Sequence, residues 1–283
     1  MIQENIPSHR DWHDATKTVL LPTGIKIAYM EVGDSACPSL ILIHGFSDSS
    51  RVWRSMMLEL QNDYHIYAVD LRGFGQSDKP KQFVYTMAEQ AADVIAFMDK
   101  KEIRDALVMG HSMGSMIAQN VAFSDPDRIR GVALLATFSH MHETQKAVRE
   151  VQDFYNVLDI QGSTDEELLR NFIPDSESLQ DQSFVQGYLS TLKGLTGSGL
   201  SAAWFGMSMA DNRNFLQFIK APVFIGWGSE DAIFTKAYQD ELREYLPDAK
   251  YEDFVGIAHE IPTEIPKHAA EAVNGFFQSI TNS

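Results

Sequence analysis

The chain has 283 residues, of which 44% are hydrophobic and 22% charged, and it carries a formal net charge of -16 at pH 7. This length permits one large α/β domain with an insertion or two small domains, and the composition is typical of a globular enzyme rather than of a disordered or fibrous chain. The excess of carboxylates repels phosphate backbones and anionic lipid, so we expect a small neutral or apolar molecule as the partner rather than nucleic acid or a membrane surface.

The first half of the chain alternates between strand and helix patterns. Residues 16–21 and 25–32 alternate apolar and polar positions around a Pro-Thr-Gly turn, which predicts an antiparallel hairpin at a sheet edge. Further strands are predicted at residues 40–43, 64–69 and 106–109, and helices at residues 52–60 and 87–98. Strands that alternate with helices predict a parallel sheet covered on both faces.

The second half returns to this alternation after a long interruption. Strands are expected at residues 132–136, 222–227 and 250–255, and helices at residues 238–246 and 266–280. Between the first two of these strands, residues 138–214 show helical patches and Gly/Ser-rich loops without a clear strand pattern. Consecutive strand–helix units need only short connections, so we predict a helical cap domain at 138–214, inserted into a core domain of residues 1–137 and 215–283.

Four glycines lie between Gly194 and Gly206 inside the predicted cap, next to Trp204 and Phe205. Glycine-rich segments bend easily, so this stretch suggests a flexible hinge with aromatic side chains at its end. An equally good interpretation is that these aromatic residues only attach the cap to the core.

The stretch Gly110-His111-Ser112-Met113-Gly114 joins the predicted strand 106–109 to a helix pattern rich in small residues. It matches the G-x-S-x-G elbow, in which a very tight turn holds a nucleophile in strained backbone geometry and requires small residues two positions before and after it. The helix behind the turn points free N–H groups at negative charge that forms there. Ser112 is therefore the predicted nucleophile, placed to attack a carbonyl.

Three further motifs follow a known order. The strand 40–43 ends in His44-Gly45-Phe46, the run Asp70-Leu71-Arg72-Gly73-Phe74-Gly75-Gln76-Ser77 comes next, and an acid and a histidine follow the elbow near the C-terminus. Together they make the chain resemble the α/β-hydrolase superfamily over nearly its whole length. The resemblance implies an α/β fold with a mostly parallel eight-stranded sheet flanked by helices, and an inserted helical cap that closes over the serine.

A serine hydroxyl is a weak nucleophile until a base removes its proton. The resemblance assigns this role to His259, which follows the last predicted strand in the family's order of serine, acid and histidine. The run Glu264-Ile265-Pro266 also matches the family's sequence after the histidine. We expect His9, His13, His65, His140, His142 and His268 to be surface residues or core residues with satisfied hydrogen bonds.

The base needs an acid that orients its imidazole and stabilises its cation. The resemblance assigns Asp231, which has the family's spacing from Gly228, and Glu230 is the rival but is expected to face solvent. Asp70 precedes the serine, so we interpret it as structural, either pairing with Arg72 or capping the following turn.

The resemblance also implies an oxyanion hole made by the backbone N–H groups of Phe46 and Met113, while His44 braces the loop. We expect an apolar substrate pocket. Its predicted lining residues are Phe46, Met113, Phe138, Trp204, Phe205 and Met207.

These features predict a cofactor-free serine hydrolase that cleaves an ester or lactone of a hydrophobic small molecule through an acyl-enzyme on Ser112. His259 then activates the water that releases the acid. No metal ligand spacing suits zinc, no G-x-G-x-x-G follows a strand and no Walker pattern occurs, so we expect neither a metal nor a cofactor.

Several alternatives share parts of this pattern. Epoxide hydrolases and dehalogenases of the family use an aspartate nucleophile, which Ser112 argues against, and the loop at His44 does not resemble the Gly-Gly-Pro-rich loop of proline iminopeptidases. Carbon–carbon bond hydrolases and cofactor-free haloperoxidases share the triad and stay open. A slow-turnover ligand receptor of the same fold is also open, and turnover rate would distinguish it from an enzyme.

The N-terminal thirty residues contain no signal-peptide hydrophobic region, and no apolar run approaches the ~18 residues of a membrane span. A cytoplasmic location is the default expectation. The single cysteine, Cys37, excludes an intrachain disulfide. Monomer and homodimer are both open.

Overall fold

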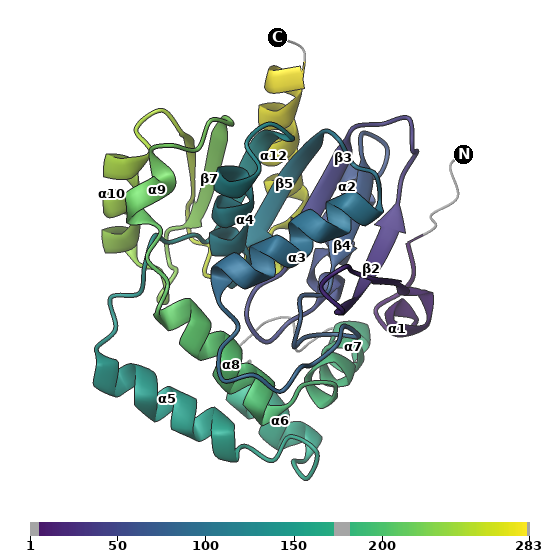
Figure 1. Cartoon of the computed structure of the whole chain (residues 1–283), viewed down its shortest axis with the longest axis vertical. Helices are drawn as coiled ribbons and strands as arrows, with labels where there is room; N and C mark the ends of the chain where they lie inside the picture. Colours follow the sequence, from purple (N-terminus) through teal and green to yellow (C-terminus); the bar gives the residue numbers. More distant parts are fainter. Residues whose placement is uncertain (1–5, 173–181, 282–283) are drawn as a thin grey trace.

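A computed structural model describes residues 6–172 and 182–281 and places one eight-stranded sheet at the centre of the molecule (Figure 1). The strand order is β1-β2-β4-β3-β5-β6-β7-β8; β1 and β2 pair antiparallel, β2 pairs antiparallel with β4, and the remaining pairs are parallel. The strands are β1 (Lys17–Leu20), β2 (Lys26–Val32), β3 (Ser39–Ile43), β4 (His65–Val69), β5 (Ala106–His111), β6 (Ile129–Leu135), β7 (Val223–Gly228) and β8 (Lys250–Phe254). The predicted α/β fold with a mostly parallel eight-stranded sheet is confirmed.

Helices cover both faces of this sheet, and a further group of helices lies at one end of it (Figure 1). Those in the described part of the chain are α1 (Trp12–Ala15), the 3-10 turn η1 (Ser50–Trp53), α2 (Arg54–Leu60), α3 (Met87–Lys100), α4 (Met113–Ser124), α5 (Gln145–Val157), α6 (Asp165–Phe172), α7 (Gln182–Lys193), α8 (Gly197–Ser208), α9 (Arg213–Leu216), α10 (Lys236–Tyr245), α11 (Ile261–Glu264) and α12 (Pro266–Thr281). Within the described ranges, none of these helices combines the length and the apolar character needed to cross a membrane.

Alternation along the strands separates the core into two layers. Ile41 and Ile43 of β3 belong to a cluster that includes side chains of α3 and α4, whereas Leu40 and Leu42 belong to a second cluster with α2 and α12. Successive side chains of a strand point to opposite faces, so a continuous apolar run serves both layers at once. This explains why the central strands read as unbroken hydrophobic segments in the sequence.

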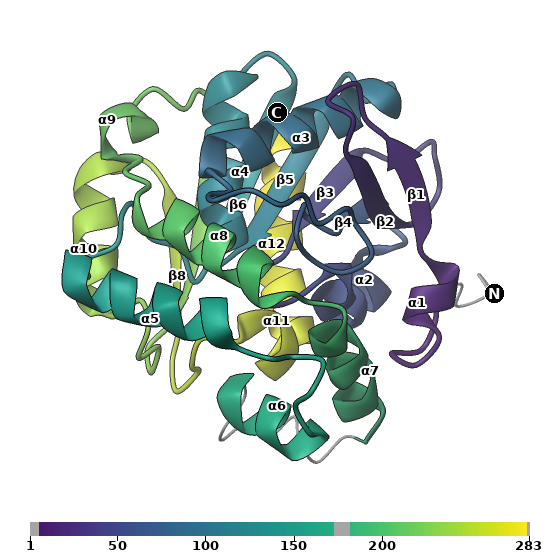
Figure 2. The ribbon, with the colours of Figure 1, turned by 60° about the horizontal axis from the view of Figure 1, so that its bottom comes forward.

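The chain between β6 and α9 is helical and lies at one end of the sheet, in the lower part of Figure 1. Helices α5 and α8 pack side by side, and α6 and α7 complete this helical insertion, which corresponds to the predicted cap at 138–214 (Figure 2). Its two ends meet in an isolated β-bridge between His140 and Asp211. Part of the predicted cap, residues 173–181, lies outside the described residues.

The prediction of a flexible glycine hinge at 194–206 is wrong for most of that stretch, because α8 is a regular helix. A Cβ added to Gly206 would lie 1.8 Å from the carbonyl oxygen of Tyr85, and one added to Gly197 would lie 2.4 Å from that of Tyr155. These glycines allow close approach of neighbouring backbone instead of bending. The sequence alone cannot separate these two uses of glycine.

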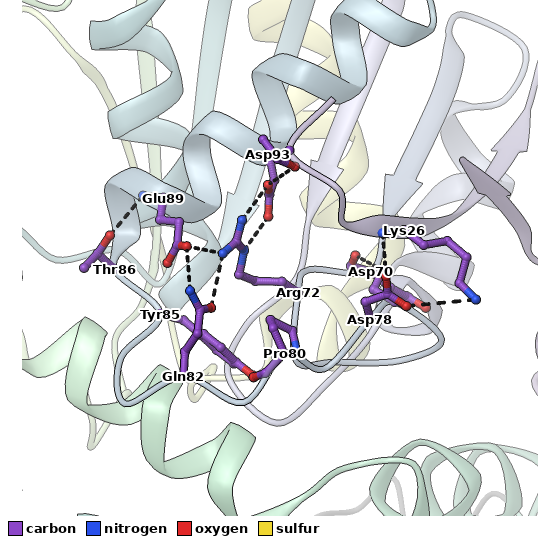
Figure 3. A network of polar contacts seen from close by, with 12 residues as sticks. Lys26, Asp70, Arg72, Asp78, Pro80, Gln82, Tyr85, Thr86, Glu89 and Asp93 are labelled. Carbon is purple, nitrogen blue, oxygen red and sulfur yellow. Dashed lines mark hydrogen bonds and ion pairs between the residues drawn. The ribbon is translucent and has the colours of Figure 1, made fainter. Parts of the chain in front are cut away.

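The segment from Asp70 to Ser77 forms a polar clamp beside the sheet (Figure 3). Asp70 accepts hydrogen bonds from the backbone N–H groups of Ser50 at 2.7 Å and Gln76 at 2.8 Å, so its predicted turn-capping role is confirmed. Its predicted alternative, pairing with Arg72, is wrong: the guanidinium of Arg72 donates to both carboxylate oxygens of Asp93 on α3, at 2.5 and 2.7 Å. The clamp therefore ties the loop after β4 to both η1 and α3.

We predict that Gly114→Ala destabilises the protein by about 1–3 kcal/mol, because overpacking forces the backbone apart. The new Cβ would lie 2.2 Å from the carbonyl oxygen of Ile43 and 2.4 Å from that of His44. Urea unfolding followed by circular dichroism measures the change. Gly275→Ala is the matched control: it lies in α12 with open space around the new Cβ and should stabilise by up to ~1 kcal/mol. Equal effects of the two substitutions would contradict the packing argument.

Candidate active site

Ser112 stands on the turn between β5 and α4 with a φ of 52° and a ψ of -122°. This positive φ is strained for a residue with a side chain, and the surrounding packing must hold it. A Cβ on Gly110 would lie 2.3 Å from the carbonyl oxygen of Gly114, so both flanking positions need glycine. The Ser112 N–H donates to the carbonyl of Leu135 on β6 at 3.0 Å, which anchors the turn to the sheet.

His259 lies in the loop after β8, and its Nδ1 donates a hydrogen bond to Oδ2 of Asp231 at 2.8 Å. The other carboxylate oxygen, Oδ1, accepts the backbone N–H groups of Ile233 at 2.8 Å and Phe234 at 2.9 Å. These bonds fix the carboxylate after β7, and they leave Nε2 of a neutral His259 as a proton acceptor. The rival acid, Glu230, is exposed as expected.

Asp231 and His259 each stabilise the charged form of the other. Burial opposes ionisation of both groups, but the hydrogen bond and charge of each partner outweigh it, so the pKa of His259 is raised and that of Asp231 lowered from their ordinary values. Asp231 is therefore an anion, and it stabilises a positive charge on the imidazole.

His111, the residue before Ser112, braces the loop that carries His259. Its Nε2 donates to the backbone carbonyl of His259 at 2.9 Å. Burial and the neighbouring imidazole lower the pKa of His111 to about 3, so it stays neutral and keeps this donor role at physiological pH. Sequence analysis did not single out His111; its position inside the elbow was the available signal.

The loop after β3 lies directly against Ser112. A Cβ on Gly45 would come within 3.2 Å of Cβ of Ser112, so the backbone of this loop passes close to the serine. Among the described residues, the N–H of the next residue, Phe46, has no hydrogen-bond partner. Met113 begins α4, and the first N–H groups of a helix lack intrahelical partners. Both predicted oxyanion donors thus belong to segments that border Ser112.

His44 braces this loop, as predicted. Its Nδ1 donates to the carbonyl of Gly45 at 2.7 Å, and its Nε2 accepts the N–H of Leu71 at 3.1 Å. Full burial lowers its pKa, which keeps the ring neutral in the one tautomer that makes both bonds.

A cavity of about 380 Å³ opens between the core and the helical insertion, and both Ser112 and His259 line it. Three of the six predicted pocket residues line it as well: Phe46 from the core loop, and Trp204 and Met207 from α8. The volume falls in the range of small-molecule sites.

The other three predicted pocket side chains lie elsewhere. Phe138 is fully buried and stacks on Phe234, with ring centroids 4.0 Å apart, so Phe234 lies in the lining where Phe138 was expected. Phe205 packs on Phe83, because one residue's step along a helix turns the side chain by about 100° from that of Trp204. The side chain of Met113 is in the hydrophobic core, which leaves only its backbone for a site role.

Sequence analysis missed several side chains that line the cavity. They are aromatic residues of the insertion and three carboxylates: Tyr155, Phe172, Phe184, Tyr188, Asp48, Glu143 and Glu260. For Tyr155, the helical spacing from the buried residues Val148 and Gln152 of α5 was a usable signal. Glu260 could have been noted as the immediate neighbour of His259.

A model of the alpha/beta hydrolase fold family matches residues 38–264. The chain belongs to this family.

One relative is similar over almost the whole chain and another over less than half of it. An uncharacterised hydrolase of Bacillus subtilis (strain 168), YugF, is 24% identical over 260 residues, which is 90% of this chain and 95% of that protein. Bifunctional epoxide hydrolase 2 of Sus scrofa is 32% identical over 121 residues, 42% of this chain and 21% of that protein.

Solved structures confirm the fold. A hydrolase from Pseudomonas aeruginosa PA01 has a TM-score of 0.83 at 22% identity, covering 93% of this chain and 98% of its own. The enol-lactonase from Burkholderia xenovorans LB400 also has a TM-score of 0.83, at 20% identity over 93% of this chain and 100% of its own. A thermophilic esterase from Thermogutta terrifontis reaches 0.80 at 20% identity, covering 94% and 98%.

One group outside the cavity centre has the side chains of a metal site. Nitrogens of His140 and His142 and a carboxylate oxygen of Glu241 lie within 4.8 Å of one another where the insertion leaves the core. Glu241 accepts from His142 at 3.0 Å, and the guanidinium of Arg213 approaches the same carboxylate to 3.7 Å. Because Arg213 already places a positive charge beside this carboxylate, a metal cation would be repelled there. The group is therefore an ion-pair cluster.

We predict that the imidazole of His259 titrates above its ordinary pKa, and that Asp231→Asn moves this titration downwards because burial then acts without the opposing charge. A pKa raised in the folded state gives stability that is complete below the unfolded value and is lost as pH rises through the folded value. An NMR pH titration of the histidine side chains measures the shift.

The matched control for this titration is Glu230→Gln, the exposed neighbour of Asp231, which should leave the titration of His259 in place. His111 should remain neutral through the same range. An unchanged His259 pKa in Asp231→Asn would contradict the proposed origin of the shift.

Proposed function

We propose that this protein is a cofactor-free serine hydrolase that cleaves a carboxylic ester or lactone of a small molecule through an acyl-enzyme on Ser112. One observation carries the proposal: a serine on a strained turn at a helix N-terminus and a histidine held by a buried aspartate line the same cavity. This is the combination that acyl transfer requires, since the nucleophile, its base and the group that orients the base are all present.

In the proposed first half-reaction, Oγ of Ser112 attacks the ester carbonyl and Nε2 of His259 takes the hydroxyl proton. The resulting oxyanion accepts hydrogen bonds from the N–H groups of Phe46 and Met113, each worth roughly 100- to 1000-fold in rate. The protonated His259 then gives its proton to the leaving alcohol oxygen as the carbon–oxygen bond breaks. The acyl group remains on Ser112.

Water completes the proposed cycle. His259 removes a proton from a water molecule, whose oxygen attacks the acyl carbon, and the same proton returns to Oγ of Ser112 as the acid leaves. Asp231 stays ionised throughout and stabilises the imidazolium that forms twice per turnover. The neutral His111 keeps the backbone of His259 in place during both transfers.

The helical insertion supports the assignment of a partly apolar substrate. Tyr155 of α5 and Trp204 of α8 both pack against Phe46, with ring centroids 5.4 and 6.1 Å apart, and all three line the cavity. We propose that the insertion, residues 138–214, acts as a cap that excludes water and selects the substrate.

Two comparisons bear on the bond that is cleaved. Ser112 replaces the aspartate nucleophile that epoxide hydrolases of this family use, so the partial similarity to an epoxide hydrolase does not extend to its chemistry in this proposal. The enol-lactonase and the esterase with the same fold favour an ester or lactone substrate.

We predict that Ser112→Ala lowers kcat on p-nitrophenyl esters of short to medium chain length, or on a lactone, by about 10⁴-fold or more, because the base then has no nucleophile to activate. Steady-state kinetics with the ester series and a lactone panel measure this loss. Ser124→Ala is the matched control, as an exposed serine at the far end of α4.

Labelling with a fluorophosphonate gives a second readout that does not depend on the choice of ester. Wild type and Ser124→Ala should be labelled once per chain, on Ser112, and Ser112→Ala should stay unlabelled in mass spectrometry. If wild type turns over no ester or lactone and Ser112 is not labelled, the proposal is wrong.

A further inference from the structure

The cavity beside Ser112 is lined by two kinds of side chain. Phe46, Tyr155 and Trp204 are aromatic. Asp48 and Glu260 supply carboxylates, and Glu143 is an exposed lining residue. Among the described residues that line the cavity, none is a lysine or an arginine, and the basic groups beside Glu260 are the imidazoles of His111 and His259.

Of the two carboxylates, that of Glu260 has fewer hydrogen-bond donors around it. One of its oxygens lies within 4.8 Å of ring nitrogens of both His111 and His259. In the part of the chain that the structure describes, neither carboxylate oxygen accepts a hydrogen bond. Burial raises its pKa, and the charge of His259 offsets only part of this effect. Glu260 is partly buried, and a carboxylate held in such a place without donors is stabilised by a ligand that supplies positive charge or N–H donors.

The negative charge of Asp48 is balanced in part by groups that do not line the cavity. Its Oδ1 accepts the N–H of Ser49 at 2.8 Å and lies 3.6 Å from the guanidinium of Arg51. That guanidinium is 2% exposed and does not line the cavity. Burial still raises the pKa of Asp48, and Glu260 adds to this rise because the two carboxylates are close enough to repel.

The aromatic wall adds a second feature that favours a cation. The faces of Trp, Tyr and Phe rings attract ammonium groups within about 6 Å, by ~0.5–2 kcal/mol per contact. Phe46, Tyr155 and Trp204 form one contiguous aromatic group on the cavity wall. The lining of this cavity therefore combines carboxylates with aromatic rings, and both kinds of group attract an ammonium group.

We propose that the cavity contains a subsite for a cationic ammonium group and that the preferred substrate is an ester or lactone that carries one. The proposal rests on the proposed function for its choice of ester chemistry. Glu260 and Asp48 act as specificity-determining residues: they attract the cation and repel a carboxylate-bearing substrate of the same size. The reacting carbonyl then lies at Ser112, next to the subsite.

Three thioesters of one acid test this order: butyrylthiocholine, its neutral 3,3-dimethylbutyl isostere, and an isostere that ends in a carboxylate. We predict that kcat/KM falls about tenfold or more from the cationic to the neutral ester, and again from the neutral to the anionic ester. Equal kcat/KM for the cationic and neutral esters, or a preference for the anionic one, would overturn the proposal.

The variant Glu260→Gln keeps the shape of the side chain and removes its charge. Since Glu260 neighbours His259, the readout is the ratio of kcat/KM for the cationic and neutral esters within each variant, which cancels a general loss of catalysis. We predict that this ratio drops several-fold, and further in Asp48→Asn combined with Glu260→Gln. Asp127→Asn, an exposed acid outside the cavity, removes the same charge and should keep the wild-type ratio.

Binding separates this proposal from the proposed function. If wild type hydrolyses none of the three esters, tetramethylammonium chloride is titrated into wild type and Glu260→Gln by calorimetry, with sodium chloride as the ionic control. Binding to wild type that weakens about tenfold or more in Glu260→Gln supports the subsite even though the ester chemistry fails. No tetramethylammonium binding to a correctly folded wild type, or equal binding to both proteins, overturns the subsite.

Discussion

The close packing of backbone around Ser112 is the constraint on which the rest of the site depends. Gly110 and Gly114 have no space for side chains, because the turn between β5 and α4 folds on itself and presses against the carbonyl groups at the end of β3. This packing holds Ser112 at a positive φ that it would leave in a looser environment. It also brings the loop that contains Gly45 against the serine, so the proposed nucleophile and a proposed donor for its oxyanion are positioned by one contact.

Burial has opposite consequences for the ionisable groups of the site, depending on their partners. Asp231 accepts three hydrogen bonds and remains charged, whereas His111 has no counter-charge strong enough to keep it protonated and becomes a neutral brace. The pKa of His259 is raised although burial opposes it, through the hydrogen bond and charge of Asp231 and the charges of Glu260 and Glu264. Three neighbouring groups thus respond differently to burial because each has a different set of donors and charges around it.

Local patterns were sufficient to predict a parallel sheet covered by helices and to single out Ser112, because strand alternation and the glycine spacing of a tight turn are properties of the adjacent sequence. The resemblance to the α/β-hydrolase superfamily, and not a local pattern, pointed to Asp231 and His259, and the structure brings them together because parallel strands bring their following loops to one edge. The side chains that line the cavity could not be predicted in either way. Whether Phe205 or Trp204 of α8 faces the cavity depends on how that helix packs on Tyr85 and α5, which no short segment encodes. The glycines of α8 were misinterpreted as a hinge for the same reason.

The acidic composition of the chain also bears on how a cation would reach the cavity. A net charge of -16 was interpreted from the sequence as a bar to anionic partners, and a field of this sign also draws cations toward the surface. Salt at physiological strength screens that long-range attraction over about 8 Å, whereas the partly buried Glu260 and Asp48 act across a few ångströms. Attraction by the surface therefore affects how fast a cation arrives, and the two carboxylates of the proposed subsite affect how well it is held once it is there.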